Sequence, residues 1–360
     1  MFERKAGGGR SERERISGMM ARRALFIASA LAFLLALVGW SITLGTSGIS
    51  AADAYAAVAN ALLPGTFDVS DQTMRIVVNL RAPRVLMAVF AGSALAIGGC
   101  LTQAMLKNPL ATPYTLGVSS GAGFGAALSI LFGINILGGA WGTVANAFAF
   151  SLIPIAIVFA ASRARPISPT AMILCGVAVS YMFSAANTIF QFFGEANAVK
   201  SVVFWMVGDL NGVGLWSVPY VAAPMLAVFA ASMLLSKRMN LMRMGDDTAR
   251  GFGVNAGAMR MGSMVMACAL TAATVSFTGA IGFVCLLAPQ ISRIFVGTDM
   301  RYLIPASALT GACMLSVADM AAKTVMAPIM LPVGAVTALV GGPVLVLMLL
   351  AGRQPGGVRD

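Results

Sequence analysis

The feature that most constrains this chain is the recurrence of uncharged, apolar runs long enough to cross a lipid bilayer. The first run, ALFIASALAFLLALVGWSITLG at 24–45, directly follows Arg22 and Arg23. A bilayer-spanning helix needs about 20 predominantly apolar residues. Comparable runs follow at 85–105, 114–134, 141–162, 170–192, 217–235, 261–281, 283–297, 303–322 and 332–351. Because lipid offers the backbone no hydrogen-bond partner, each run is predicted to be a helix.

Composition supports the same fold class. The chain is 59% hydrophobic and only 10% charged, whereas soluble domains average about 25% charged residues. We therefore predict an all-α integral membrane protein with ten transmembrane helices. A single transmembrane domain, 24–351, would lie between a basic cytoplasmic tail, 1–23, and a short cytoplasmic tail, 352–360. A cleaved signal peptide is the alternative for the first run, but the run is longer than a usual signal core and follows a long basic tail.

The distribution of Lys and Arg predicts the orientation. Ten spans place both termini on one side, and basic residues mark cytoplasmic loops. With both termini cytoplasmic, all but five of the 24 Lys and Arg residues fall inside. The five outside are Arg75, Arg81, Arg84, Lys200 and Lys323. The net charge of +11 is therefore explained by basic residues on the cytoplasmic side of the cytoplasmic (inner) membrane, and not by a nucleic-acid partner. The basic N-terminal tail is expected to rest on anionic lipid.

One polar break stands out, LKNPLATPYTLGVSSGAG at 106–123. Its two prolines end one span and begin the next, so the chain is expected to turn here at the cytoplasmic face. Similar text recurs at 307–334, where Asp319 aligns with Gln103 and Lys323 with Lys107. The two segments would cross the membrane in opposite senses. We predict an inverted repeat, which is typical of transporters, although two small-residue-rich segments can also align by composition alone.

Missing motifs narrow the energy source. No GxxxxGK[ST] phosphate-binding loop is present, so the chain is not expected to hydrolyse ATP or to act as an enzyme. There is no histidine, and Asp319 is the one clear acid near a span, so proton coupling is disfavoured. The sequence therefore favours energy supplied by a partner subunit. The cysteines stand singly in apolar text and are read as small buried hydrophobes rather than metal ligands: Cys100, Cys175, Cys268, Cys285 and Cys313.

The span at 170–192 carries a polar stripe. Ser180, Ser184, Asn187 and Gln191 follow the spacing of one helix face. In lipid that face must meet protein or water. It either lines a path for a polar solute or joins helices by hydrogen bonds.

The largest predicted cytoplasmic loop, 236–260, contains GDDTARGFGVN. This segment reads as a short helix with two acids at its start, where the helix dipole favours anions, and with glycines at its end. Phe252 is its one large apolar residue. The helix either docks into a partner's groove or is a solvated loop held near lipid headgroups by basic residues.

On the outer side, RAPR places Arg81 and Arg84 just before the 85–105 span. Positive charge outside runs against the general bias, so it needs a reason. Anchoring at the membrane interface is one explanation, and docking of an acidic external partner is the other. Lys323 is expected on the same outer side.

Together these motifs resemble FecCD-type permease subunits of ABC importers for iron–siderophore complexes, haem or vitamin B12. The resemblance covers about 75–351. It rests on six motifs in the family's order: RAPR, GSALAIGGCLTQAMLKNPLATPYTLGVSSGAG, GDDTARGFGV, TGAIGFVCLLAPQISR, ADMAAK and LPVGAVTALVGGPVLVLML. It implies a type II importer fold and a second permease subunit, identical or homologous. It also implies two cytoplasmic ATPase subunits that bind the ATP, an external solute-binding protein, and no cofactor on this chain.

The resemblance also implies residue roles. Arg81, Arg84 and Lys323 would dock the binding protein, and Ser180, Ser184, Asn187 and Gln191 would line the pathway. A cytoplasmic gate would comprise Asn108, Pro109 and Leu110 on one side and the loop from Ser168 to Thr170 on the other. The ATPase coupling helix would contain Gly245, Asp246, Asp247, Ala249, Phe252 and Gly253.

The chain departs from the family's pattern in places. It has Pro289-Gln290 where Pro-His is usual, Cys285 where Gly is common, and Lys323 where Arg is common. Gln keeps a hydrogen bond but cannot take a proton, and Lys lacks the bidentate geometry of Arg. The expected function is import of a ferric siderophore by alternating access. Haem or cobalamin import, an ion-coupled secondary carrier, and a non-transporting scaffold are the alternatives.

Overall fold

The computed structural model describes residues 12–45, 47–164 and 168–350 and is helical throughout its regular elements. The helices are α1 (Glu12–Thr43), α2 (Ala51–Leu62), α3 (Asp71–Ile76), α4 (Ala82–Leu106), α5 (Val118–Phe132), α6 (Gly142–Ala164), α7 (Pro169–Phe193), α8 (Ala196–Val207), α9 (Val218–Met244), α10 (Asp246–Gly251), α11 (Ala256–Thr278), α12 (Val284–Val296), α13 (Met300–Thr324) and α14 (Val333–Leu350). A π-helical turn, Val77–Arg81, joins α3 to α4.

Each of the ten predicted runs coincides with one helix, so the all-α membrane fold is confirmed. Among the described residues, seven helical segments are long and apolar enough to cross a membrane. They contain α1, α4, α6, α7, α9, α11 and α13. The helices α5, α12 and α14 are shorter, and α8, which the sequence did not predict, is a further short apolar helix. The count of ten spans therefore stays a prediction.

The helix α4 lies at the centre of the fold, with most of its side chains buried. Three of its glycines let neighbouring backbones approach closely. A Cβ added at Gly92 would lie 2.4 Å from the carbonyl oxygen of Gly311 in α13. A Cβ added at Gly99 would lie 1.7 Å from the carbonyl oxygen of Cys285 in α12. At Gly98 it would lie 2.8 Å from the side chain of Thr271 in α11. Small residues are the usual means of close helix packing in membranes, where lipid provides no hydrophobic drive between helices.

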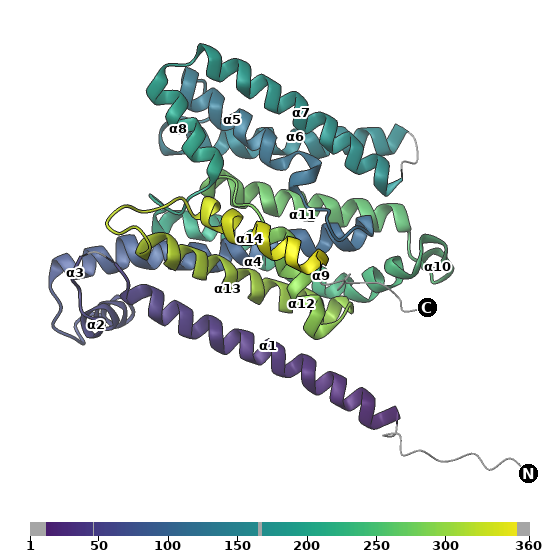
Figure 1. Ribbon diagram of the computed structural model, residues 1–360, viewed down its shortest axis with the longest axis horizontal. Helices are drawn as coiled ribbons and strands as arrows, with labels where there is room; N and C mark the ends of the chain where they lie inside the picture. Colours follow the sequence, from purple (N-terminus) through teal and green to yellow (C-terminus); the bar gives the residue numbers. More distant parts are fainter. Residues whose placement is uncertain (1–11, 46, 165–167, 351–360) are drawn as a thin grey trace, which may run out of the picture.

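The helices α4 and α13 lie side by side and run in opposite directions (Figure 1). Ser93, in the middle of α4, donates to the carbonyl of Ala308 at 3.1 Å. Arg84, at the start of α4, meets Asp319 near the end of α13. The two similar segments therefore run in opposite directions, as the predicted inverted repeat requires. The repeat itself stays a prediction.

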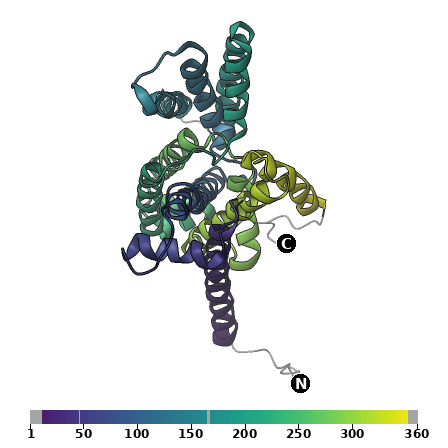
Figure 2. The ribbon, with the colours of Figure 1, turned by 90° about the vertical axis from the view of Figure 1, so that its left-hand side faces the viewer.

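The two ends of the molecule differ. The short helix α10 lies at one end, toward which α1 begins and α14 ends, while α2 and α3 cap the opposite end (Figure 1). The helices α5 to α8 group on one side of the molecule (Figure 2), with α11 between this group and α4. We call the α10 end the coupling end and the α2–α3 end the cap end.

The helix ends differ from the predicted apolar runs in two places. The expected loop at 236–260 is largely helical, because α9 continues to Met244 and α11 begins at Ala256. The helix α9 thus continues beyond its apolar run through basic residues of the predicted loop. The helix α1 does the same at its start, since it begins at Glu12, inside the predicted N-terminal tail. Residues 1–11 and 351–360, which hold the rest of the two tails, lie outside the described residues.

Candidate functional site

The predicted short helix at the coupling end is present as α10. Gly245, with φ of 133°, precedes it, and Asp246 and Asp247 occupy its first turn. The helix ends at Gly251, and Gly253, with φ of 77°, turns the chain toward α11. Both glycines adopt backbone conformations that other residues rarely reach.

The two sides of α10 have different surroundings. Ala249 is fully buried, whereas the side chain of Phe252 just after the helix is 70% exposed. The exposed Phe252 borders an open groove of about 670 Å³ between α9 and α11. An apolar side chain left in this position is available to a partner surface.

The acids of α10 also differ. Asp246 accepts from Nη2 of Arg260 at 2.8 and 2.7 Å and from Nζ of Lys107 at 3.2 Å. The hydrogen bond from Arg260, assisted by Lys107, holds the pKa of Asp246 below its usual value. Asp247 has a fully exposed side chain, 3.6 Å from Arg250. Asp246 is thus bound within the subunit, while Asp247 faces outward.

The predicted gate segment forms a tight turn after α4. Lys107 adopts a left-handed conformation, with φ of 51°, and ends the helix. The Oδ1 of Asn108 accepts from the backbone N–H of Leu110 at 2.9 Å. The buried Gln290 of α12 donates from Nε2 to the carbonyl of Pro109 at 2.8 Å. The turn 107–110 is therefore held from α12, with Leu110 exposed at its tip.

The other predicted half of the gate lies at the start of α7. The Ser168 side chain caps α7 by accepting from the N–H of Ala171 at 3.2 Å, and Thr170 is exposed. Among the described residues, the structure records no hydrogen bond between this segment and the turn 107–110. The helix α7 instead packs on the short helix at Tyr114–Leu116, where a Cβ on Gly176 would lie 2.6 Å from Leu116.

The polar stripe of α7 divides between two environments. Ser180 and Ser184 border an open groove of about 350 Å³, whose other lining residues are Tyr114, Thr115, Val177 and Tyr181. Asn187 is buried beside Gly123 of α5 and Met206 of α8. Gln191 donates to the sulfur of Met206 at 4.0 Å. The structure thus places half of the stripe on a groove and half at a helix junction.

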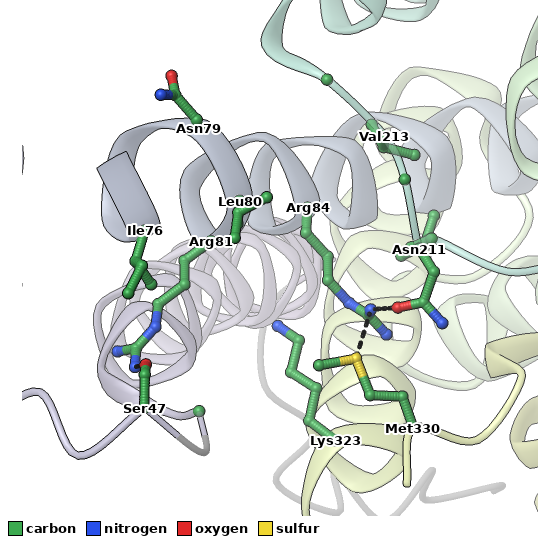
Figure 3. Close-up of a pocket in the computed structure, with 14 residues that line it drawn as sticks. Ser47, Ile76, Asn79, Leu80, Arg81, Arg84, Asn211, Val213, Lys323 and Met330 are labelled. Carbon is green, nitrogen blue, oxygen red and sulfur yellow. Dashed lines mark hydrogen bonds between the residues drawn. The ribbon is translucent and has the colours of Figure 1, made fainter. Parts of the chain in front are cut away.

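At the cap end, Arg81 is buried and fixes the end of α1. Its Nη1 donates to the carbonyls of Ile42 and Thr43 at 3.0 Å each. Its Nη2 donates to Ser47 at 2.8 Å (Figure 3). A cation at this position satisfies carbonyls that lack partners within the helix and complements the dipole of α1.

Arg84 and Lys323 share one buried acid. Asp319 lies 2.6 Å from Nε of Arg84 and 2.5 Å from Nζ of Lys323. Arg84 also donates to Asn211 in the segment that precedes α9 (Figure 3), and Asp209 lies 4.0 Å away. A cavity of about 400 Å³ opens between these elements, and Arg81, Arg84 and Lys323 all line it.

These contacts bear on one expectation. Arg81, Arg84 and Lys323 are each less than 10% exposed and are bound within the subunit, so their role in docking a binding protein stays a prediction. Charge alone does not distinguish a cation that faces a partner from one that caps a helix or pairs with a buried acid.

Three side chains that hold these sites together were not predicted from the sequence as contact partners. Arg260 was counted only among the basic residues of a loop, and Gln290 only as a departure from a family pattern. Asp319 was aligned with Gln103 but was not paired with Arg84, which is 235 positions away. No local spacing in the sequence signals such contacts.

Comparison with known proteins decides the family. The FecCD transport family matches residues 33–351. The chain belongs to the FecCD transport family. Curated relatives include a hemin transport system permease of Yersinia pestis, 34% identical over 79% of this chain and 86% of the relative. An Fe(3+)-citrate import system permease of Bacillus subtilis is 32% identical over 93% of this chain and 96% of the relative.

A further FecCD relative is a vitamin B12 import system permease of Salmonella paratyphi A, 35% identical over 75% of this chain and 82% of the relative. A solved structure of an inward-facing metal-chelate type ABC transporter is also similar. It has a TM-score of 0.79 at 25% identity and covers 90% of this chain and 98% of the solved chain. This FecCD protein is accordingly a multi-pass permease subunit of an ABC importer, a transport component and not an enzyme.

Proposed function

We propose that this subunit imports a ferric siderophore across the cytoplasmic membrane by alternating access. The observation that carries the proposal is the coupling end, where Lys107 of the turn 107–110 pairs with Asp246 of α10, and Arg260 bridges Asp246 to the Met105 carbonyl at the end of α4. A movement that a partner imposes on α10 can therefore be transmitted to the turn 107–110. Among the relatives, the Fe(3+)-citrate and hemin permeases carry names of iron-containing cargo, and this favours an iron chelate.

The proposed pathway runs along the exposed face of α7. The groove beside Ser180 and Ser184 is open on one side, and large apolar side chains of α7, such as Tyr181 and Phe192, are exposed. In a membrane, the polar groups on this face need protein or water against them. A second permease subunit, identical or homologous, would complete a weakly polar channel suited to a bulky chelate.

The proposed partners follow from the two ends. Two ATPase subunits would bind at α10 and Phe252, and both termini would lie on that cytoplasmic side. A binding protein would dock at the cap end. Docking on Arg84 or Lys323 would require these cations to exchange Asp319 for acids of the partner.

The proposal is tested by ATP hydrolysis in a reconstituted complex of this subunit, its ATPase and its binding protein. We expect the iron-loaded binding protein to stimulate hydrolysis more than the empty protein. Equal rates with both forms would reject coupled import. Mass spectrometry of ligand that copurifies with the cognate binding protein would identify the cargo, and recovery of haem or a corrinoid would reject the siderophore assignment.

A further inference from the structure

The N-terminal end of α10 is fastened to the C-terminal end of α4 through one guanidinium group. Arg260 of α11 donates from Nη2 to both oxygens of Asp246, at 2.8 and 2.7 Å. The same side chain donates from Nε to the backbone carbonyl of Met105 at 3.2 Å. One side chain thus bridges α10 and α4.

Pro109 explains why the Met105 carbonyl is available. In a continuing helix this carbonyl would accept from the N–H of residue 109, but proline has no N–H. The carbonyl is therefore one of the unpaired acceptors at the end of α4. Arg260 satisfies it, and its positive charge complements the negative end of the α4 dipole.

Lys107 adds a second link. Its Nζ lies 3.2 Å from Oδ1 of Asp246, and its backbone forms the left-handed end of α4. Asp246 also lies in the first turn of α10, where the helix dipole favours an anion. The Asp246 carboxylate thus links the positive, N-terminal end of α10 to the two cations, Arg260 and Lys107, that lie at the negative, C-terminal end of α4.

The turn beyond Lys107 is held on its far side as well. Gln290 of α12 donates to the Pro109 carbonyl at 2.8 Å, and its side chain is buried. A displacement of Asp246 would thus pull on the turn 107–110 against a fixed point on α12. Asp247 has no such link, since its side chain is fully exposed and lies near Arg250 of its own helix.

We propose that Asp246, acting through Arg260, is the positioning residue that transmits movement of α10 to the turn 107–110. This inference rests on the proposed function, in which ATPase subunits move α10. It separates the two neighbouring acids, because Asp246 carries the link inward and Asp247 does not.

The test uses the complex with its ATPase in nanodiscs and a cysteine probe at the tip of the turn. The parent protein carries Leu110→Cys, with Cys175→Ala and Cys313→Ala to remove the two native cysteines that are partly exposed. A membrane-impermeant maleimide labels the probe with and without trapped ATP. The measured quantity is the ratio of the labelling rates with and without ATP. If the role of Asp246 were purely structural, its replacement would not selectively remove the ATP-dependent difference.

In the parent we expect ATP to change the labelling rate, and the same change is expected in the control Asp71→Asn, an exposed acid in the first turn of α3 at the cap end. In Asp246→Asn, the change should fall at least about threefold, because the lost contacts are charge-assisted, while the ATPase still copurifies. Asp246→Glu should recover part of the response. An Asp246→Asn complex that responds like the parent would overturn the inference.

Arg260→Met gives an independent reading if Asp246→Asn fails to assemble, because Arg260 is mostly buried and leaves the surface of α10 unchanged. Loss of the ATP response in this variant supports the link, and a parent-like response overturns it. If the parent itself does not respond to ATP although the ATPase is bound and active, the proposed function fails, and the inference fails with it.

Discussion

Replacing Asp319 by Asn should strongly destabilise the subunit, since this buried acid serves two cations. Its carboxylate lies 2.6 Å from Arg84 and 2.5 Å from Lys323, and its side chain is only 1% exposed. Asn keeps the shape but removes the charge, and leaves two cations facing each other. Two unit charges roughly 5 Å apart repel by about 3 kcal/mol at an effective dielectric constant of about 20. Breaking one side of a buried ion pair costs a similar amount, about 3–5 kcal/mol.

Loss of the Asp319 charge should be more unfavourable for Lys323 than for Arg84. Arg84 keeps Asn211 and, at 4.0 Å, Asp209. Lys323 keeps only the Ser41 hydroxyl at 3.4 Å among the contacts that the structure describes. In the background of Asp319→Asn, Lys323→Met should therefore restore more stability than Arg84→Met. Combining all three as Asp319→Leu, Arg84→Met and Lys323→Met should return close to the parent, because a packed apolar set avoids the desolvation of buried charge.

The assay is unfolding of the purified subunit in detergent, followed by circular dichroism during titration with sodium dodecyl sulfate. Asp247→Asn is the matched control, and its exposed carboxylate predicts no measurable change. A loss below about 1 kcal/mol for Asp319→Asn, as for an exposed pair, would refute the reasoning. So would an equal rescue by the Lys323 and Arg84 variants.

Three further predictions concern packing, capping and pH. Gly99→Ala should destabilise the subunit by about 1–3 kcal/mol by overpacking α4 against the Cys285 carbonyl, whereas Gly262→Ala, with no atom near its added Cβ, should not; thermal unfolding compares the two. Arg81→Met should raise hydrogen exchange at 42–47, where its donors are lost, and unchanged exchange would contradict the capping role. The lowered pKa of Asp246 means that its contribution is present above the unfolded pKa of about 3.9 and is lost as pH falls through the lower folded value. Hydrogen exchange of α10 should therefore rise below about pH 4 in the parent but not in Asp246→Asn.

Hydropathy predicted the helices well because lipid imposes one rule on every span. A run such as 24–45 must form its own backbone hydrogen bonds, so its helix α1 follows from composition. The helix α8 escaped the same reasoning, since 12 residues are too few to span a bilayer. The helix α9 likewise extends past the predicted start of the loop at 236, because a helix can continue beyond its apolar run into basic sequence.

The sites were less predictable, because their contacts join distant parts of the chain. The short helix α10 and its ending glycines follow from local residue types, and both were predicted correctly. That Asp246 binds Arg260 while Asp247 faces outward depends on how the chain turns from α10 into α11, which carries Arg260. Likewise, the charge of Arg81 was visible in the sequence, but the free carbonyls that it caps at the end of α1 were not.

Uptake of an iron-loaded siderophore into proteoliposomes tests the central claim most directly. The vesicles would contain this subunit with its ATPase, and the loaded binding protein would be added outside. The account predicts accumulation of iron that requires both internal ATP and the binding protein. Uptake that persists without the ATPase, or that a pH gradient alone drives, would contradict it.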